Sequence, residues 1–164
     1  MFKKVAMSAP VLALAFVSSA ALAVPQTHNI QVVADIPSAD FYVQPVSHDT
    51  VRDPQQLLWN NTTSQLEGIS RDFRAKSSVA TGTAPAIKAT LLAPAVLSSG
   101  ANEIELNVKF NNVALTVGSD VDVIAAGGAP SEIIVPLSIQ PVEPSGKYQE
   151  GNYTGNVSVM FDAP

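Results

Sequence analysis

The sequence predicts an all-β protein, and three observations lead to this fold class. Apolar and polar residues alternate over several short stretches, which is the period of a strand with one buried face. Clusters of glycine, proline, asparagine and serine separate these stretches and indicate turns. The chain contains 12 prolines, and proline interrupts long helices. Short strands joined by turns are typical of a β-sandwich or a β-barrel.

The first segment, residues 1–23, is interpreted as a secretory signal peptide. Lys3 and Lys4 precede an apolar run from Val5 to Val17, and small residues ending in Ala23 follow. This order is typical of an export signal, so cleavage is expected after Ala23. The apolar run is shorter than the roughly 20 residues that a membrane-spanning helix requires. We therefore expect a secreted protein rather than a membrane-anchored one.

The next segment, residues 24–36, is predicted to be an N-terminal arm that can form a strand. Residues 24–29 are polar and show no periodicity. Pro37 ends the alternation that follows. An ordinary first strand, paired within its own sheet, is the alternative interpretation of this arm. The apolar side chains of the alternating part are those of Ile30, Val32, Ala34 and Ile36.

Further strands are expected in the domain formed by residues 37–164. Residues 103–110 give the clearest alternation and predict a half-buried strand. Residues 71–79 come closest to a helical pattern, but they are too polar for a helix to be assigned. The predicted last strand has one face formed by residues 153, 155, 157, 159 and 161. The strands are expected at residues 41–46, 56–59, 65–69, 86–92, 103–110, 114–117, 133–139 and 152–161.

The composition limits the classes of partner and the chemistry. Nine basic and 14 acidic residues give a net charge of −5, and without Lys3 and Lys4 the balance is 7 − 14 = −7. This charge argues against nucleic acid and anionic membranes as partners. The chain has no cysteine, so disulfides, thiol catalysis and thiolate metal sites are excluded. An apolar fraction of 46% with 14% charged residues is typical of a chain that buries surface against copies of itself.

No sequence motif predicts an enzyme, a cofactor or a metal site. The nucleophile motif G-x-S-x-G is absent, and the two histidines are His28 in the arm and His48 in a polar loop. A metal cluster of His48, Asp49 and Asp53 lacks a recognised ligand spacing. Residues 120–122 contain two aspartates, but a turn leading into a strand explains them better than a calcium loop does.

Both ends of the exported chain carry recognisable motifs. Near the start stands Asn29-Ile30-Gln31-Val32-Val33-Ala34-Asp35-Ile36, and residues 150–161 read Glu-Gly-Asn-Tyr-Thr-Gly-Asn-Val-Ser-Val-Met-Phe. These segments resemble the N-terminal extension and the C-terminal strand of the major pilins of colonization-factor (alpha-clade, class 5) chaperone-usher fimbriae. Leu58-Trp59, Phe73 and residues 86–92 follow in a similar order. The approach to Asn29 is one residue longer than is usual, which leaves the register of the arm open.

The resemblance implies an incomplete immunoglobulin-like sandwich that a donor strand from the neighbouring subunit completes. The implied donor residues are Ile30, Val32, Ala34 and Ile36. From its place just after the arm, Pro37 is expected to be a hinge between subunits. The C-terminal strand is expected to line the groove and contact a chaperone, with basic chaperone residues holding the carboxylate of Pro164. The residues expected on that strand are Tyr153, Val157, Val159, Phe161 and Pro164.

The function implied by the resemblance is that of a structural major subunit of a fimbria, or pilus, which polymerises head to tail and supports cell adhesion. The implied partners are further copies of the chain, a periplasmic chaperone, an outer-membrane usher and a minor tip adhesin. The implied route leads through the periplasm to the cell surface.

The alternative function is a secreted or tip-located β-sandwich adhesin, a carbohydrate-binding module. Trp59, Tyr42 and Tyr148 would then form a sugar platform. A tip adhesin normally has a second domain, for which residues 24–164 leave no room.

Overall fold

The computed structural model describes residues 40–164. The predicted signal peptide, the four donor residues and the predicted hinge Pro37 therefore lie outside the described residues. Within the described part, strands dominate and one short helix, α1 (Asp49–Arg52), is present. The predicted all-β fold class is confirmed.

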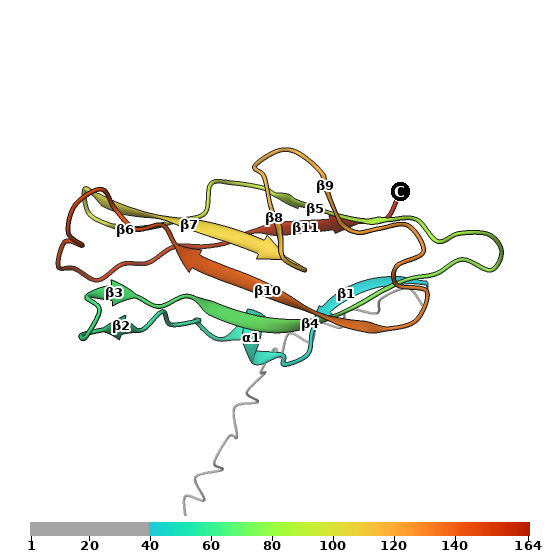
Figure 1. The fold of residues 1–164 in the computed structure, drawn as a ribbon, viewed down its shortest axis with the longest axis horizontal. Helices are drawn as coiled ribbons and strands as arrows, with labels where there is room; N and C mark the ends of the chain where they lie inside the picture. Colours follow the sequence, from blue (N-terminus) through green and yellow to red (C-terminus); the bar gives the residue numbers. More distant parts are fainter. Residues whose placement is uncertain (1–39) are drawn as a thin grey trace, which may run out of the picture. The chain divides into compact units, whose positions relative to one another are not determined.

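The strands form two facing sheets and a small hairpin (Figure 1). The larger sheet contains, in spatial order, β1 (Phe41–Pro45), β4 (Ile69–Ser77), β10 (Ile133–Pro141), β7 (Asn102–Phe110) and β6 (Val96–Ser99), and β8 (Val113–Ala114) pairs with β7. The smaller sheet contains β11 (Val159–Asp162), β5 (Ile87–Leu91) and β9 (Val121–Ile124). The hairpin pairs β2 (Trp59–Asn60) with β3 (Gln65–Leu66).

All the ladders between these strands are antiparallel, and the alternation of the sequence sets which face is buried. In β7, for example, Ile104, Val108 and Phe110 are buried while Glu103 and Glu105 are exposed. Asn111 and Asn112 then adopt positive φ values of 50° and 64° in the turn to β8. Such values suit a two-residue hairpin turn, and asparagine tolerates them better than most residues.

The core lies between the two sheets and includes a cluster of three aromatic rings. Phe110 of β7 is fully buried, and its ring centroid lies 5.8 Å from that of Phe73 in β4 and 4.7 Å from that of Phe161 in β11. The Phe73 and Phe161 centroids are 6.4 Å apart. The cluster therefore joins the larger sheet to the smaller one, and such ring pairs each contribute about 0.5 to 1.5 kcal/mol beyond the burial of their area.

Several strands differ from the sequence prediction. Residues 71–79, which were too polar to be assigned, contribute most of β4, a central strand of the larger sheet. Its outward positions include Arg74, and its inward positions include the small buried residues Ala75 and Ser77. Apolar alternation is therefore weak, although the strand is well paired. β6 was not predicted, because four residues leave little pattern to recognise.

The predicted last strand, residues 152–161, is regular over a shorter range than expected. The ladder with β5 covers only Val159–Asp162, and an isolated bridge joins Thr154 to Ser98. The backbone between them remains extended enough for Ser158 to accept a hydrogen bond from the Leu92 amide. Gly155 lies against β6, where a Cβ atom would come within 2.0 Å of the Val96 carbonyl oxygen. This close approach leaves no room for a side chain at residue 155.

Candidate functional site

The smaller sheet ends at β11, which has β5 as its single neighbour among the strands of residues 40–164. The opposite edge of β11 therefore carries no ladder within this part of the chain. Edge strands present free amide and carbonyl groups and are templates for pairing with a further strand. The larger sheet ends at β1 and β6, and residues of β1, β6 and β11 all line one cleft.

A cleft of about 750 Å³ spans the inward face of the larger sheet, with lining residues from all of its strands between β1 and β6, and it is bounded by residues of the C-terminal segment. Protein cores rarely contain voids larger than a water molecule, so a cleft of this size shows that the two sheets do not close against each other here. Its lining is mainly apolar: it includes Val43, Pro45, Leu57, Ile69, Phe73, Leu97, Leu106, Leu137, Ile139, Val157, Val159 and Phe161. Several of these side chains are only partly buried: they pack against the core and also line the cleft.

Four of the five residues predicted on the C-terminal strand line this cleft. They are Tyr153, Val157, Val159 and Phe161. All four are half-buried, whereas Thr154, Asn156, Ser158 and Met160 between them are exposed. Pro164 is exposed beyond β11 and is not part of the lining. The alternation read from the sequence thus identifies the half-buried side chains of this segment, although Thr154, Gly155 and Asn156 also line the cleft.

Another wall of the cleft was not predicted from the sequence. It is formed by residues 50–57, which include most of α1 and the segment that follows it. Arg52 of α1 forms ion pairs with Asp49 at 3.0 Å and with Asp53 at 3.2 Å. Gln55 donates hydrogen bonds to the backbone carbonyls of Asp49 and Asp53. This wall is therefore held by its own polar contacts rather than by a ladder.

One further charged side chain, Arg71 of β4, lines the cleft. Its Nε donates a hydrogen bond to Oε1 of Gln55 at 2.7 Å, and its Nη1 donates to the carbonyl of Ser70 at 2.9 Å. Both acceptors are neutral. Sequence analysis did not single out Arg71, although its even spacing from Phe73 and Ala75 placed it on the buried face of any strand through these residues.

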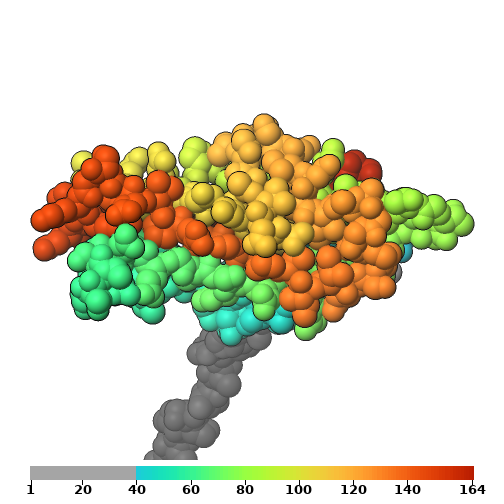
Figure 2. All heavy atoms as spheres, in the orientation of Figure 1, coloured from blue at the N-terminus to red at the C-terminus, as the bar shows by residue number. Residues whose placement is uncertain are grey.

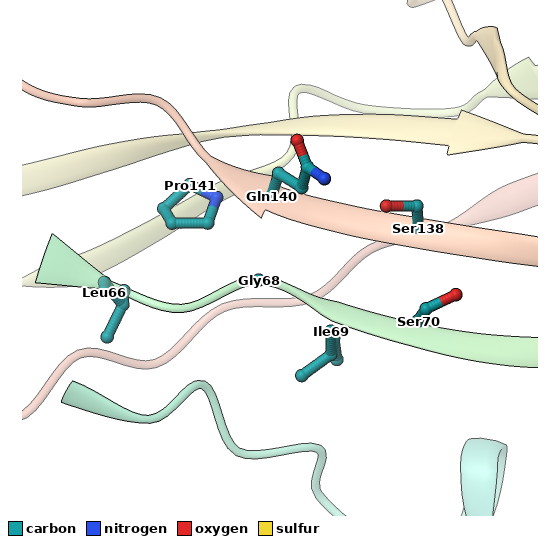
Figure 3. A pocket seen from close by; sticks show the side chains of 7 residues that line it. All are labelled: Leu66, Gly68, Ile69, Ser70, Ser138, Gln140 and Pro141. Atoms are coloured by element: carbon teal, nitrogen blue, oxygen red, sulfur yellow. The ribbon is translucent and has the colours of Figure 1, made fainter. Parts of the chain in front are cut away.

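A second, smaller cavity of about 300 Å³ lies between β3, β4 and β10 (Figure 3). Ser70 and Ser138 face each other across the ladder, and Gln140 lies farther along β10. None of the seven lining residues is titratable. This cavity therefore offers neither an acid–base pair nor an ionised nucleophile for chemistry.

The acidic clusters weighed as metal sites have other roles in the structure. Asp49 and Asp53 both bind Arg52, and Asp120 accepts a hydrogen bond from the hydroxyl of Thr90. Residues 120–122 lead into β9, as predicted. Within residues 40–164, no group of three or more His, Cys, Asp and Glu side chains is placed to hold a metal ion. In the same part of the chain, no helix is long and apolar enough to cross a membrane.

Trp59 and Tyr148, two of the three aromatic residues considered as a sugar platform, have their rings in contact. The ring centroids of Trp59 and Tyr148 are 5.4 Å apart in an edge-to-face arrangement. Burial and the Glu143 carboxylate raise the pKa of Tyr148. Tyr42 instead donates a hydrogen bond to Glu132, which is the main reason why its pKa is raised. It therefore stands apart from the Trp59–Tyr148 pair.

The domain has loops at both ends of the sheets (Figure 2). The connection between β4 and β5 projects at one end, and the connection after β10 lies at the other. These loops are distinct from the cleft lining described above, except where residues 153–157 return along β6.

Comparison with known proteins identifies the family. The CS1 type fimbrial major subunit family matches this chain over residues 26–162. The structure is similar to that of the CooA pilin subunit from enterotoxigenic Escherichia coli, with a TM-score of 0.54 and 20% sequence identity over 73% of this chain and 86% of that one. No curated protein sequence matches the chain.

The likeness to the CooA pilin supports the fold: a nearly all-β, immunoglobulin-like sandwich that is incomplete, in agreement with the open cleft beside β11. The family match covers most of the sequence, including both terminal motifs. The chain therefore belongs to the family of CS1 type fimbrial major subunits, and it is a structural shaft subunit of a cell-surface fimbria.

Proposed function

We propose that the chain polymerises by donor-strand exchange, in which residues 24–36 of one subunit occupy the cleft of the next. The observation that carries this proposal is the cleft itself: about 750 Å³, mainly apolar, and open along the free edge of β11. A cleft of this kind is unfavourable in water, because its apolar side chains are hydrated and, within residues 40–164, one edge of β11 has no strand partner. An added strand satisfies both requirements at once.

The proposed donor segment has the matching pattern. Ile30, Val32, Ala34 and Ile36 share one face, so an inserted strand directs all four toward the cleft floor. Full burial of an isoleucine or valine side chain contributes about 1.5 to 3 kcal/mol, and that of the alanine less. Ladder hydrogen bonds to β11 add to this. The arm of a subunit would thus replace the strand that its neighbour lacks.

Head-to-tail insertion does not close on itself, so the product is a filament. In this proposal Pro37 is the hinge between the inserted strand and the domain that follows, residues 37–164. Its fixed φ limits the directions in which the chain can leave the groove. The subunit then has one donor and one acceptor site, as a shaft requires.

The route to the fibre completes the proposal. Residues 1–23 direct export and are removed, a periplasmic chaperone fills the cleft first, and an outer-membrane usher exchanges the chaperone for the next arm. The C-terminal strand contacts the chaperone through its cleft-facing residues, and basic chaperone side chains hold the carboxylate of Pro164. A minor adhesin occupies the tip, and the fibre supports adhesion. The role is structural and not enzymatic.

The test uses the full-length precursor in cells that carry its assembly system. The double variant Ile30→Asp/Val32→Asp places two charges against the apolar floor, and surface fibres should be lost while the subunit still reaches the periplasm. Gln31→Asp is the matched control, since residue 31 belongs to the opposite face of the arm. Electron microscopy and the amount of periplasmic subunit are the measurements. Normal fibres from the double variant would contradict donor-strand exchange through residues 24–36.

A further inference from the structure

Arg71 occupies an unusual position in the cleft. In the ladder between β4 and β10 it stands opposite Leu137, and the neighbouring pairs on the same face are Ile69 with Ile139 and Phe73 with Val135. These neighbours are apolar: Phe73, Val135, Leu137 and Ile139 pack on or within the core, and Ile69 lines the cleft. A cation therefore stands in the middle of an otherwise apolar row.

The charge of Arg71 has no carboxylate partner within residues 40–164. Its guanidinium donates hydrogen bonds to the side-chain amide oxygen of Gln55 and to the carbonyl of Ser70. The other cleft arginine, Arg52, is already paired with Asp49 and Asp53 of its own segment. Arg71 is also exposed, so it reaches water while its Nε contacts Gln55 in the segment of residues 50–57 that lines the cleft.

We propose that Arg71 sets the register of the inserted strand by pairing with Asp35 of the neighbouring subunit. This inference rests on donor-strand exchange, and it adds the residue that selects among possible insertions. Asp35 is the single acidic residue within residues 24–36, which contain no lysine or arginine. It belongs to the face of the arm opposite Ala34 and Ile36, and that face looks out of the cleft toward its mouth.

The apolar pattern alone does not define one register. A slip of one residue exchanges the two faces of the arm and is strongly disfavoured, but a slip of two residues keeps apolar side chains on the floor. A charge distinguishes these registers. Insertion removes part of the water around Arg71, and this loss is less unfavourable when a carboxylate is supplied. Only the register that brings Asp35 to Arg71 supplies one, so slipped insertions are disfavoured by the same contact that stabilises the correct one.

The test is a double-substitution cycle on fibres assembled from the full-length precursor. The rate at which subunits are released from heated fibres is measured for the wild type, Arg71→Gln, Asp35→Asn and the double variant. Each single substitution should raise the release rate about two- to fivefold, the range for an ion pair at a solvent-accessible site. The double variant should release subunits no faster than either single variant, since the pair is already lost.

The matched control is Arg74→Gln, which removes an arginine from the outward face of the same strand, where Glu132 of the same subunit lies 3.9 Å away. Its fibres should release subunits at the wild-type rate. Should Arg71→Gln fail to fold, Arg71→Lys keeps the charge, and Asp35→Asn and Asp35→Arg change only the arm. Wild-type release from Asp35→Asn fibres, or single effects that multiply in the double variant, would overturn the pairing.

The outcome also separates this inference from donor-strand exchange. If Ile30→Asp/Val32→Asp abolishes fibres but Asp35→Asn has no effect, the arm inserts and Arg71 does not select its register. If the Ile30→Asp/Val32→Asp fibres assemble normally, the strand exchange itself is wrong.

Discussion

Replacing Phe161 by leucine should weaken the subunit and loosen the fibre, whereas replacing Phe110 should weaken only the subunit. Each ring contacts the other and also contacts Phe73, so each substitution removes two ring pairs from the same cluster. At about 0.5 to 1.5 kcal/mol for a ring pair, each substitution should lower the free energy of unfolding by about 1 to 3 kcal/mol. The midpoint of thermal unfolding should then fall by several degrees in both variants.

The two variants should differ in the fibre, because Phe161 lines the cleft and Phe110 does not. Phe161 gains contacts with the inserted strand that Phe110 cannot gain. The loss of this packing should speed subunit release from Phe161→Leu fibres about two- to tenfold relative to Phe110→Leu fibres, equivalent to about 0.5 to 1.5 kcal/mol. Circular dichroism of the purified subunit and gel analysis of heated fibres are the assays. Equal release rates from the two variants would refute the idea that the cleft is the binding surface between subunits.

Two further predictions concern the domain itself. Gly155→Val should lower the midpoint of thermal unfolding markedly, because the new Cβ would come within 2.0 Å of the Val96 carbonyl oxygen. The matched control is Gly146→Val, which should leave the midpoint nearly unchanged because no heavy atom lies within 4 Å of a Cβ at that position. Asp120→Ala should lower the free energy of unfolding more than Thr90→Val does. The first substitution leaves the hydroxyl of Thr90, a buried residue, without its acceptor, whereas the second leaves the carboxylate of the exposed Asp120 to be solvated by water. Equal losses in chemical denaturation would contradict this asymmetry.

The sequence predicted the strands whose two faces differ most in polarity. β7 and β10 were found within one or two residues at each end, because their buried positions hold large apolar side chains. Most of β4 was missed for the opposite reason: after Ile69, its inward positions hold Arg71, Ala75 and Ser77, and only Phe73 among them resembles a core residue. A small side chain can be fully buried against a neighbouring strand, but that burial depends on tertiary contacts that alternation does not encode.

The cleft was predictable on one side only. The face of residues 153–161 follows from alternation, and Tyr153, Val157, Val159 and Phe161 do line the cleft. The wall of residues 50–57 is an irregular segment, held by the contacts of Arg52 and Gln55, and no sequence period predicts where such a segment packs. The proposed roles of Pro37 and Pro164 remain predictions that the assembly experiments address.

The most direct test of the proposed assembly is a cysteine cross-link between subunits. The chain has no cysteine, so a pair introduced at Val159 in the cleft and at one arm position provides the only thiols. Arm positions 30 to 36 are scanned one at a time in fibres treated with an oxidant, and products are separated without reducing agent. The account predicts a ladder of covalent oligomers when the cysteine occupies an apolar-face position near Val159, and weak or absent cross-linking at the odd-numbered positions between. Equal cross-linking at all positions, cross-links confined to single subunits, or no ladder at any position would contradict the insertion of one subunit's arm into the cleft of the next.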